Sequence, residues 1–388
     1  MFAEPFRVSV DQDTLTDLRR RLGQTRLGKP GGTLAPGDGI SVEYMTELIE
    51  YWRDTFDWSA QERSLNRWRH FRATIDGARV HFIHEPGRGP RPLPIIVTHG
   101  WPGSFVEMLK VIPLLTDPAS YGGDDSDAFD VVVPSLPGFG FSELPTGRHG
   151  LNAFEIANIW NQLMHGLGYQ RFGAQGGDFG ASISTAIGLR HPGSLIGMHL
   201  NYIPGSFTPF LEASAPLTDQ EIAFQAGAIA WYDTDGAYAH VQRTRPRTLA
   251  YGLEDSPVGL AAWIVEKFGE WGDCAGHIES RFTKDELLSN VMIYWATRTA
   301  YSASRLYVEM RDHPLTFGPG EYIDVPVGVA RLPLEAPFPP REWVERGYRV
   351  ERWTELPSGG HFAAMEEPER LVEDIRAFFR PLRMPDGD

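Results

Sequence analysis

The chain has 388 residues, of which 42% are hydrophobic and 22% are charged, which is the balance of a soluble globular protein with a large core. Its formal net charge of −15 argues against nucleic acid and against an anionic membrane surface as partners. The single cysteine, Cys274, excludes an intrachain disulfide. Neither a leader peptide nor an apolar stretch of membrane-spanning length is visible. These features predict a cytoplasmic protein.

The N-terminal segment, residues 1–70, is predicted to be helical. Leucines recur at helical spacing after residue 11, and a second amphipathic pattern covers 42–55, with a Gly- and Pro-rich loop over 28–39 between them. The segments 71–75 and 79–84 then flank Asp76-Gly77. This dipeptide between two strand-like runs predicts a β-hairpin.

An alternation of strands and helices follows over residues 71–203. The predicted strands are continuous apolar runs, typical of strands buried on both faces of a parallel sheet. They cover 93–98, 129–133, 171–174 and 195–200, with helices over 105–115, 154–167 and 179–191. Residues 204–310 are helical and aromatic without a strong strand, and 311–388 resume the alternation. The pattern predicts a mostly parallel α/β sheet interrupted by a helical lid.

The segment Gly176-Gly177-Asp178-Phe179-Gly180 lies between a predicted strand and a predicted helix. This context is typical of the nucleophile elbow of the α/β-hydrolase fold, whose sharp turn requires small residues. Asp178 stands where a serine is usual, which disfavours a serine esterase. A carboxylate is already ionised at neutral pH and can attack a carbon that bears a leaving group, forming an ester that water must cleave. The alternative is a plain turn with an aspartate helix cap.

The fold's chain order predicts an acid and then a histidine after the nucleophile. His361, in a glycine loop before the last helix, has the expected place among 12 histidines. Glu335, just past the predicted strand 325–330, is our choice for the acid. Asp324 opens that strand at its wrong end, and Glu342 and Glu345 lie on a short helix. Glu335 as a plain surface charge stays open.

Two backbone N–H groups are expected to form an oxyanion hole. One belongs to Phe179, directly after the nucleophile, and the other to Trp101, in the loop after the strand 93–98. This loop could instead be a simple strand-to-helix turn.

Three motifs together point to a family. His99-Gly100-Trp101-Pro102-Gly103-Ser104, the Asp178 elbow and Gly359-Gly360-His361-Phe362-Ala363 resemble those of the microsomal and juvenile-hormone type of epoxide hydrolase, and the similarity spans nearly the whole chain. The resemblance implies an enzyme that converts an epoxide and water into a vicinal diol. It also implies that the N-terminal segment packs around the lid and core. Membrane-bound members carry an N-terminal anchor, which this sequence does not show, so no membrane is expected.

The resemblance further implies two lid tyrosines that hydrogen-bond the epoxide oxygen. The segment Asp235–His240 points to Tyr238, and Arg305-Leu306-Tyr307 points to Tyr307. A phenol with a pKa of about 10 can donate to the alkoxide that an opening epoxide generates. The chain has 13 tyrosines, so composition alone does not select these two, and core packing is the alternative for each ring.

Two other functions stay open, a haloalkane dehalogenase and a non-catalytic member that binds a ligand under the lid. No metal or organic cofactor is expected, and nothing in the sequence decides on a homodimer. Soluble relatives in GC-rich actinobacteria include enzymes that open an epoxide on an enediyne core, so biosynthetic and detoxifying roles are both open. A bulky apolar or aromatic epoxide is expected from the lid's aromatic residues: Trp231, Tyr232, Trp263, Phe268, Trp271 and Trp295.

Overall fold

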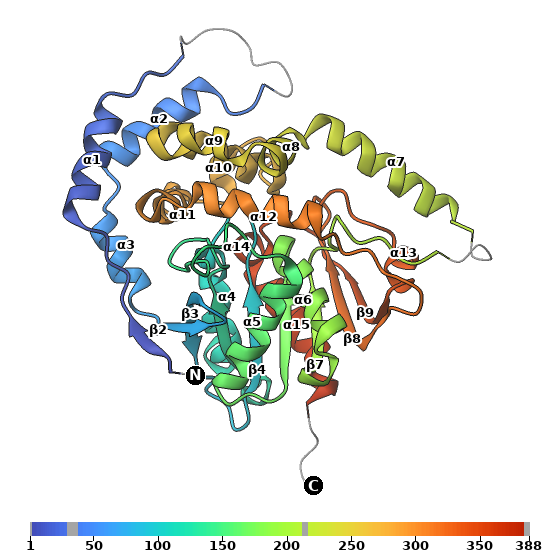
Figure 1. Cartoon of the computed structure of the whole chain (residues 1–388). Helices are drawn as coiled ribbons and strands as arrows, with labels where there is room; N and C mark the ends of the chain where they lie inside the picture. The colour runs from blue at the N-terminus through green and yellow to red at the C-terminus, as the bar shows by residue number, and fades with distance from the viewer. Residues whose placement is uncertain (1, 29–37, 212–215, 384–388) are drawn as a thin grey trace.

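The core of the protein is a nine-stranded sheet with the order β1-β2-β3-β5-β4-β6-β7-β8-β9 (Figure 1). A computed structural model describes residues 2–28, 38–211 and 216–383. The strands are β1 (Glu4–Phe6), β2 (His70–Ile75), β3 (Ala78–Glu85), β4 (Leu93–Thr98), β5 (Phe129–Pro134), β6 (Phe172–Gly176), β7 (Leu195–Leu200), β8 (Ile323–Arg331) and β9 (Tyr348–Glu355). In the order of the sheet, β1, β2, β3 and β5 pair antiparallel with their neighbours in this series. From β5 through β4, β6, β7 and β8 to β9, all neighbours pair parallel. The predicted mostly parallel sheet is therefore confirmed.

The hairpin of β2 and β3 turns at Asp76 and Gly77, which both have positive φ angles, of 49° and 79°. Two consecutive positive φ angles define the turn whose twist matches that of paired strands. This is why the Asp-Gly dipeptide predicted the hairpin correctly.

Helices cover both faces of the sheet. The helix α5 (Ala153–Gly166) packs beside α6 (Asp178–Arg190), and α4 (Val111–Thr116) packs beside α15 (Pro368–Phe379). Asp374 of α15 is buried and accepts hydrogen bonds from His199 of β7 at 2.9 Å and from Arg352 and Thr354 of β9, both at 2.7 Å. These bonds hold the pKa of Asp374 well below its usual range despite its burial. The network joins the last helix to the sheet.

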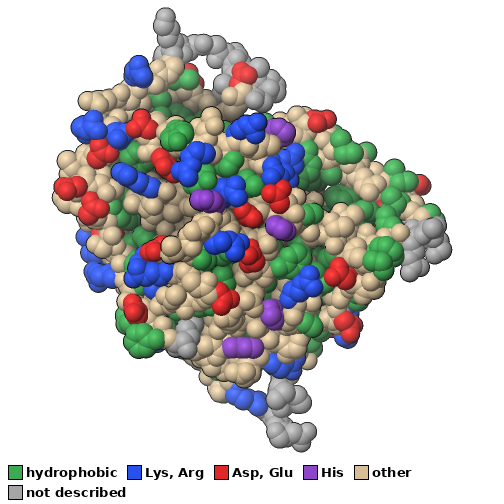
Figure 2. Space-filling view, viewed as in Figure 1, with side chains coloured by type: hydrophobic (Ala, Val, Ile, Leu, Met, Phe, Trp, Pro, Cys, Tyr) green, Lys and Arg blue, Asp and Glu red, His purple; other side chains and the backbone are tan. Residues whose placement is uncertain are grey.

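Between β7 and β8 the described residues form six α-helices, which we call the lid. They are α7 (Asp219–Thr234), α8 (Ala237–Thr244), α9 (Pro246–Asp255), α10 (Pro257–Trp271), α11 (Lys284–Thr297) and α12 (Ala300–Asp312). Figure 1 shows α8 to α12 stacked above the sheet, while α7 projects to one side. Hydrophobic side chains gather near that projecting side in Figure 2, whereas charges of both signs are interspersed over the rest of this face.

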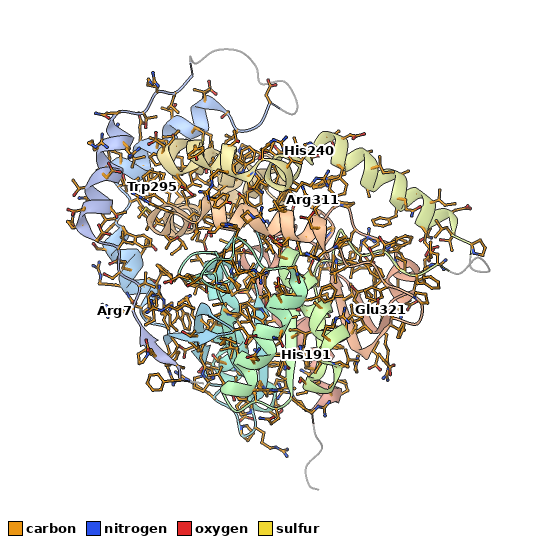
Figure 3. The ribbon with its side chains drawn as sticks, viewed as in Figure 1. Arg7, His191, His240, Trp295, Arg311 and Glu321 are labelled. Carbon is orange, nitrogen blue, oxygen red and sulfur yellow. The ribbon has the colours of Figure 1, made fainter. Side chains whose placement is uncertain are left out.

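The N-terminal segment wraps around one side of the molecule. It contains α1 (Gln12–Gly23), α2 (Val42–Asp54) and α3 (Trp58–Leu65), and α1 and α2 contact α10 and α11 of the lid. Arg21 of α1 lies over the ring of Trp295 at 5.8 Å from its centroid. Figure 3 labels Trp295 on the side of the lid that faces the N-terminal helices. The predicted loop over 28–39 falls largely outside the described residues, and the short strand β1 is not predicted by the sequence pattern.

The remaining elements are the short helices α13 (Arg341–Glu345) and α14 (Ala363–Glu366) and six 3-10 segments: η1 (Phe105–Lys110), η2 (Pro118–Tyr121), η3 (Asp125–Asp127), η4 (Pro192–Ser194), η5 (Ile278–Ser280) and η6 (Arg380–Leu382). Within the described ranges, none of the helices combines the length and the apolar character that crossing a membrane would require.

Candidate active site

Asp178 lies at a sharp turn between β6 and α6. Its φ angle is 45°, in the left-handed region that a non-glycine residue rarely adopts. A Cβ atom on Gly176 would lie 2.3 Å from the carbonyl carbon of Gly180, and one on Gly180 would lie 2.0 Å from the carbonyl oxygen of Thr98. Both glycines are therefore required by backbone packing, as the elbow geometry predicts.

Two backbone N–H groups hold the carboxylate of Asp178. The Trp101 N–H donates to Oδ1 at 2.8 Å, and the Phe179 N–H also donates to the carboxylate. The loop that carries Trp101 is fixed by the lid helix α11. There Asn290 Nδ2 donates to the carbonyl of Pro102 at 2.8 Å, and the Tyr294 hydroxyl donates to that of Gly103 at 2.7 Å. The two N–H groups predicted as an oxyanion hole thus both donate to the Asp178 carboxylate.

Glu335 and His361 follow β8 and β9 and meet beside Asp178. Both carboxylate oxygens of Glu335 lie 3.0 Å from His361 Nδ1, and His361 Nε2 lies 3.7 Å from Asp178 Oδ2. Glu335 is only 5% exposed. Among the rejected acids, Asp324 is exposed at the start of β8, and Glu342 accepts a hydrogen bond from Thr218. The geometry therefore brings the selected acid, base and carboxylate together.

The charges of this site are coupled. Burial alone would lower the pKa of His361, but the charge and hydrogen bond of Glu335, followed by the charge of Asp178, raise it to about 9. Burial raises the pKa of Asp178, against the opposing effects of His361 and of the two N–H donors. Because opposite charges within a few ångströms favour each other's ionised form, the pair is stabilised as carboxylate and imidazolium at neutral pH.

The rings of Tyr238, Tyr307 and Trp101 are mutual neighbours. The Trp101 ring stacks on Tyr238 at 5.2 Å between centroids and meets Tyr307 edge to face at 5.7 Å. The rings of Tyr238 and Tyr307 are 5.9 Å apart, and Tyr307 also contacts Phe179 at 4.9 Å. Burial, with a contribution from the charge of Asp178, raises the pKa of both phenols well above 10. Both hydroxyl groups are therefore protonated donors at neutral pH.

A cavity of about 90 Å³ adjoins Asp178, His361 and Tyr238. Of the six lid aromatics named from the sequence, Trp231 and Trp271 line this cavity. Phe268 and Trp295 are buried in the core instead. The remaining two residues are not among those that line this cavity. Trp263 Nε1 donates to Gln242 at 3.4 Å, and Tyr232 is 44% exposed.

Glu107 is a site residue that the sequence analysis does not single out. It lies on η1, is buried, and lines a second cavity of about 20 Å³ with Asp178 and His361. An acidic residue inside the apolar run 105–115 is the signal that could have found it. Within the described ranges, the active site included, no cluster of three or more His, Cys, Asp or Glu side chains has the geometry of a metal site.

Two family models match the chain. The model described as "Epoxide hydrolase N terminus" matches residues 3–108, and the model described as "alpha/beta hydrolase fold" matches residues 94–225. Together they cover the N-terminal segment, the oxyanion loop and the elbow.

Known proteins resemble the chain over almost its full length. A "Putative epoxide hydrolase" of Stigmatella aurantiaca is 44% identical over 98% of this chain and 85% of the relative. Epoxide hydrolase 1 of Oryctolagus cuniculus is 37% identical over 96% of this chain and 88% of the relative. Among solved structures, Aspergillus niger epoxide hydrolase superposes with a TM-score of 0.84 at 30% identity, covering 99% of this chain and 97% of that one. Juvenile hormone epoxide hydrolase from Bombyx mori gives 0.81 at 29% identity, covering 98% and 94%. The chain therefore belongs to the epoxide hydrolases of the microsomal and juvenile-hormone type, which are hydrolases of the α/β-hydrolase fold.

Proposed function

We propose that the chain hydrolyses a bulky apolar or aromatic epoxide to a vicinal diol through a covalent ester on Asp178. The observation that carries this proposal is the position of the Asp178 carboxylate. Its Oδ1 is held by the Trp101 N–H at 2.8 Å, whereas its Oδ2 lies toward His361 at 3.7 Å. One oxygen is thus fixed where an oxyanion would form, and the other is the nucleophile.

In the first step, Oδ2 of Asp178 attacks a carbon of the epoxide ring, and the carbon–oxygen bond of the ring breaks. Tyr238 and Tyr307 donate hydrogen bonds to the departing oxygen, and one phenol transfers its proton to the alkoxide. Because the pKa of each phenol is raised well above 10, both enter this step protonated, as a general acid must. The product of the step is a hydroxyalkyl ester.

In the second step, His361 Nε2 takes a proton from water, and the water oxygen bonds to Cγ of Asp178. The N–H groups of Trp101 and Phe179 stabilise the negative charge on Oδ1. The bond between Cγ and Oδ2 then breaks, and the diol leaves with Oδ2 and the proton from His361. The remaining proton of the water restores the phenol, so the cycle is balanced.

Ester formation itself prepares His361 for this second step. The charge of Asp178 contributes to the raised pKa of His361, and the ester is neutral. Loss of that charge lowers the pKa of His361, so His361 releases its second proton to solvent, becomes the neutral base, and regains that proton once the Asp178 carboxylate re-forms. Glu335 then stabilises the imidazolium that forms.

The proposal is tested with His361→Gln and styrene oxide. This variant is expected to form the ester and hydrolyse it slowly, which mass spectrometry of the Asp178 peptide detects as an added styrene oxide mass. Asp178→Ala is the matched control and should gain no mass. In the wild type, a single turnover in H₂¹⁸O should place ¹⁸O in Asp178 rather than in the diol. Label found only in the diol would refute the ester, and chloride release from a haloalkane without diol formation would favour a dehalogenase.

A further inference from the structure

The small cavity beside the nucleophile is large enough to hold a water molecule. Its volume is about 20 Å³, and a buried water needs on the order of 10–15 Å³. Asp178, His361, Glu107 and Gln175 are among the residues that line it. The cavity therefore adjoins both Cγ of the nucleophile and the base that activates water.

Polar groups around this cavity match the needs of a water molecule. A buried water makes two to four hydrogen bonds. Gln175 is 2% exposed, and its amide nitrogen donates to Asn201 Oδ1 at 2.7 Å. Within the part of the chain that the structure describes, Gln175 Oε1 is buried without a hydrogen-bond partner. This unpaired acceptor, the Glu107 carboxyl group and His361 Nε2 all border the cavity, and a water molecule there can donate its two hydrogens to two of them.

The backbone makes room for the carboxyl group of Glu107. A Cβ atom on Gly103 would lie 1.3 Å from Glu107 Oε1 and 2.2 Å from its carboxyl carbon. Any larger residue at 103 would therefore displace that group. The glycine of the Trp101-Pro102-Gly103 loop thus allows an acidic side chain to pack against the oxyanion loop, next to the cavity.

We propose that Glu107 positions the water that hydrolyses the Asp178 ester, an inference that rests on the covalent mechanism proposed above. His361 takes one hydrogen of this water, and Glu107 accepts a hydrogen bond from the other. With both hydrogens fixed, a lone pair of the water oxygen is directed at Cγ. Glu107 is thus a positioning residue for the second step and has no part in the first.

The electrostatics of the cavity agree with this assignment. Burial raises the pKa of Glu107 to about 8, an effect that His361 opposes and the charge of Asp178 increases. Formation of the neutral ester removes the contribution of Asp178, and the neutral His361 that the second step requires removes the opposing one. Glu107 accepts a hydrogen bond from the water in either protonation state, because a protonated carboxyl group keeps its carbonyl oxygen as an acceptor.

The test separates the two steps with rapid-quench kinetics on styrene oxide. Glu107→Gln keeps the size of the side chain and is expected to form the ester at the wild-type rate. Hydrolysis of the ester should slow at least about 10-fold, because the amide can turn its N–H₂ group, which cannot accept a hydrogen bond, toward the water, and a misoriented water reacts more slowly. The ester should therefore accumulate on the Asp178 peptide, and kcat and KM should fall together. Glu107→Asp, which retains the charge, should recover part of the hydrolysis rate.

Glu62→Gln is a matched control outside both cavities. Glu62 is half-buried and accepts hydrogen bonds at 2.7 Å from the Val10 N–H and from Trp58 Nε1. This variant should leave both steps unchanged. If Glu107→Gln hydrolyses the ester at the wild-type rate and ester accumulates only in His361→Gln, the role of Glu107 is refuted while the covalent mechanism stands. A lack of ester in both variants would refute the covalent mechanism and the role of Glu107 with it. Equal slowing of both steps would mean that Glu107 has a structural role only.

Discussion

Replacement of Glu335 by glutamine removes a charge while nearly preserving the shape of the side chain. The carboxylate oxygens lie 3.0 Å from His361 Nδ1. Two unit charges about 4 Å apart interact with about 4 kcal/mol at an effective dielectric constant of about 20. This energy corresponds to about three pKa units, or about a thousandfold in rate if all of it acts on the imidazolium formed during hydrolysis. Because the amide oxygen can still accept a hydrogen bond, we expect ester hydrolysis to slow by about 10² to 10³-fold.

Two measurements check this prediction. NMR titration should show the pKa of His361 well below the wild-type value of about 9, because the main group that raises it has lost its charge. Rapid-quench kinetics should show slow ester hydrolysis with ester formation retained. Glu342→Gln, on the short helix α13, is the control and should change neither quantity. An unchanged pKa of His361, or equal slowing of both steps in Glu335→Gln, would refute the reasoning.

Four further outcomes are expected. Tyr238→Phe and Tyr307→Phe should each slow ester formation by about 10²-fold or more, because each removes a donor to the developing alkoxide. Rapid-quench kinetics that show slow ester hydrolysis with normal ester formation would contradict this. The rate of ester formation should fall as the pH drops through the pKa of Asp178, which lies above the usual range of an aspartate, and a pH–rate profile with a limb at the usual aspartate value would contradict this. Gly100→Ala places a Cβ atom 2.1 Å from Asp178 Oδ1, so kcat/KM should drop by about 10²-fold or more, while the urea midpoint stays near that of the wild type. Asp374→Ala should cost about 3–5 kcal/mol of unfolding free energy, because it leaves buried partners unpaired, and a change below 1 kcal/mol in urea unfolding would argue against the network.

Local patterns predicted the elements that depend on local chemistry. The continuous apolar run of β4 and the Asp76-Gly77 turn of the hairpin led directly to the observed strands. The elbow was predictable because Gly176 and Gly180 meet a steric demand of the backbone itself. In contrast, β1 has only three residues and pairs with β2 far along the chain, so nothing near it in the sequence signals a strand.

The site residues also differ in how far the local sequence predicts their positions. The positions of Glu335 and His361 follow from the order of strands, since loops after parallel strands gather at one edge of the sheet. Tyr238 and Tyr307 lie on lid helices with no such rule, and only the family resemblance selected them. Glu107 belongs to an apolar run, and its place beside the nucleophile depends on how η1 folds back against Gly103, which a one-dimensional pattern does not contain.

The insertion of the lid between β7 and β8 distributes the proposed reaction cycle over two parts of the chain. The lid contributes both phenols, whereas Asp178, its N–H donors and the Glu335–His361 pair all follow strands of the sheet, Asp178 and Phe179 as the first residues of α6. The lid nevertheless reaches the second step as well, because Asn290 and Tyr294 of α11 hold the loop that carries the Trp101 N–H. A substitution that shifts α11 is therefore expected to disturb both proposed steps, whereas one confined to α8 should act on epoxide opening.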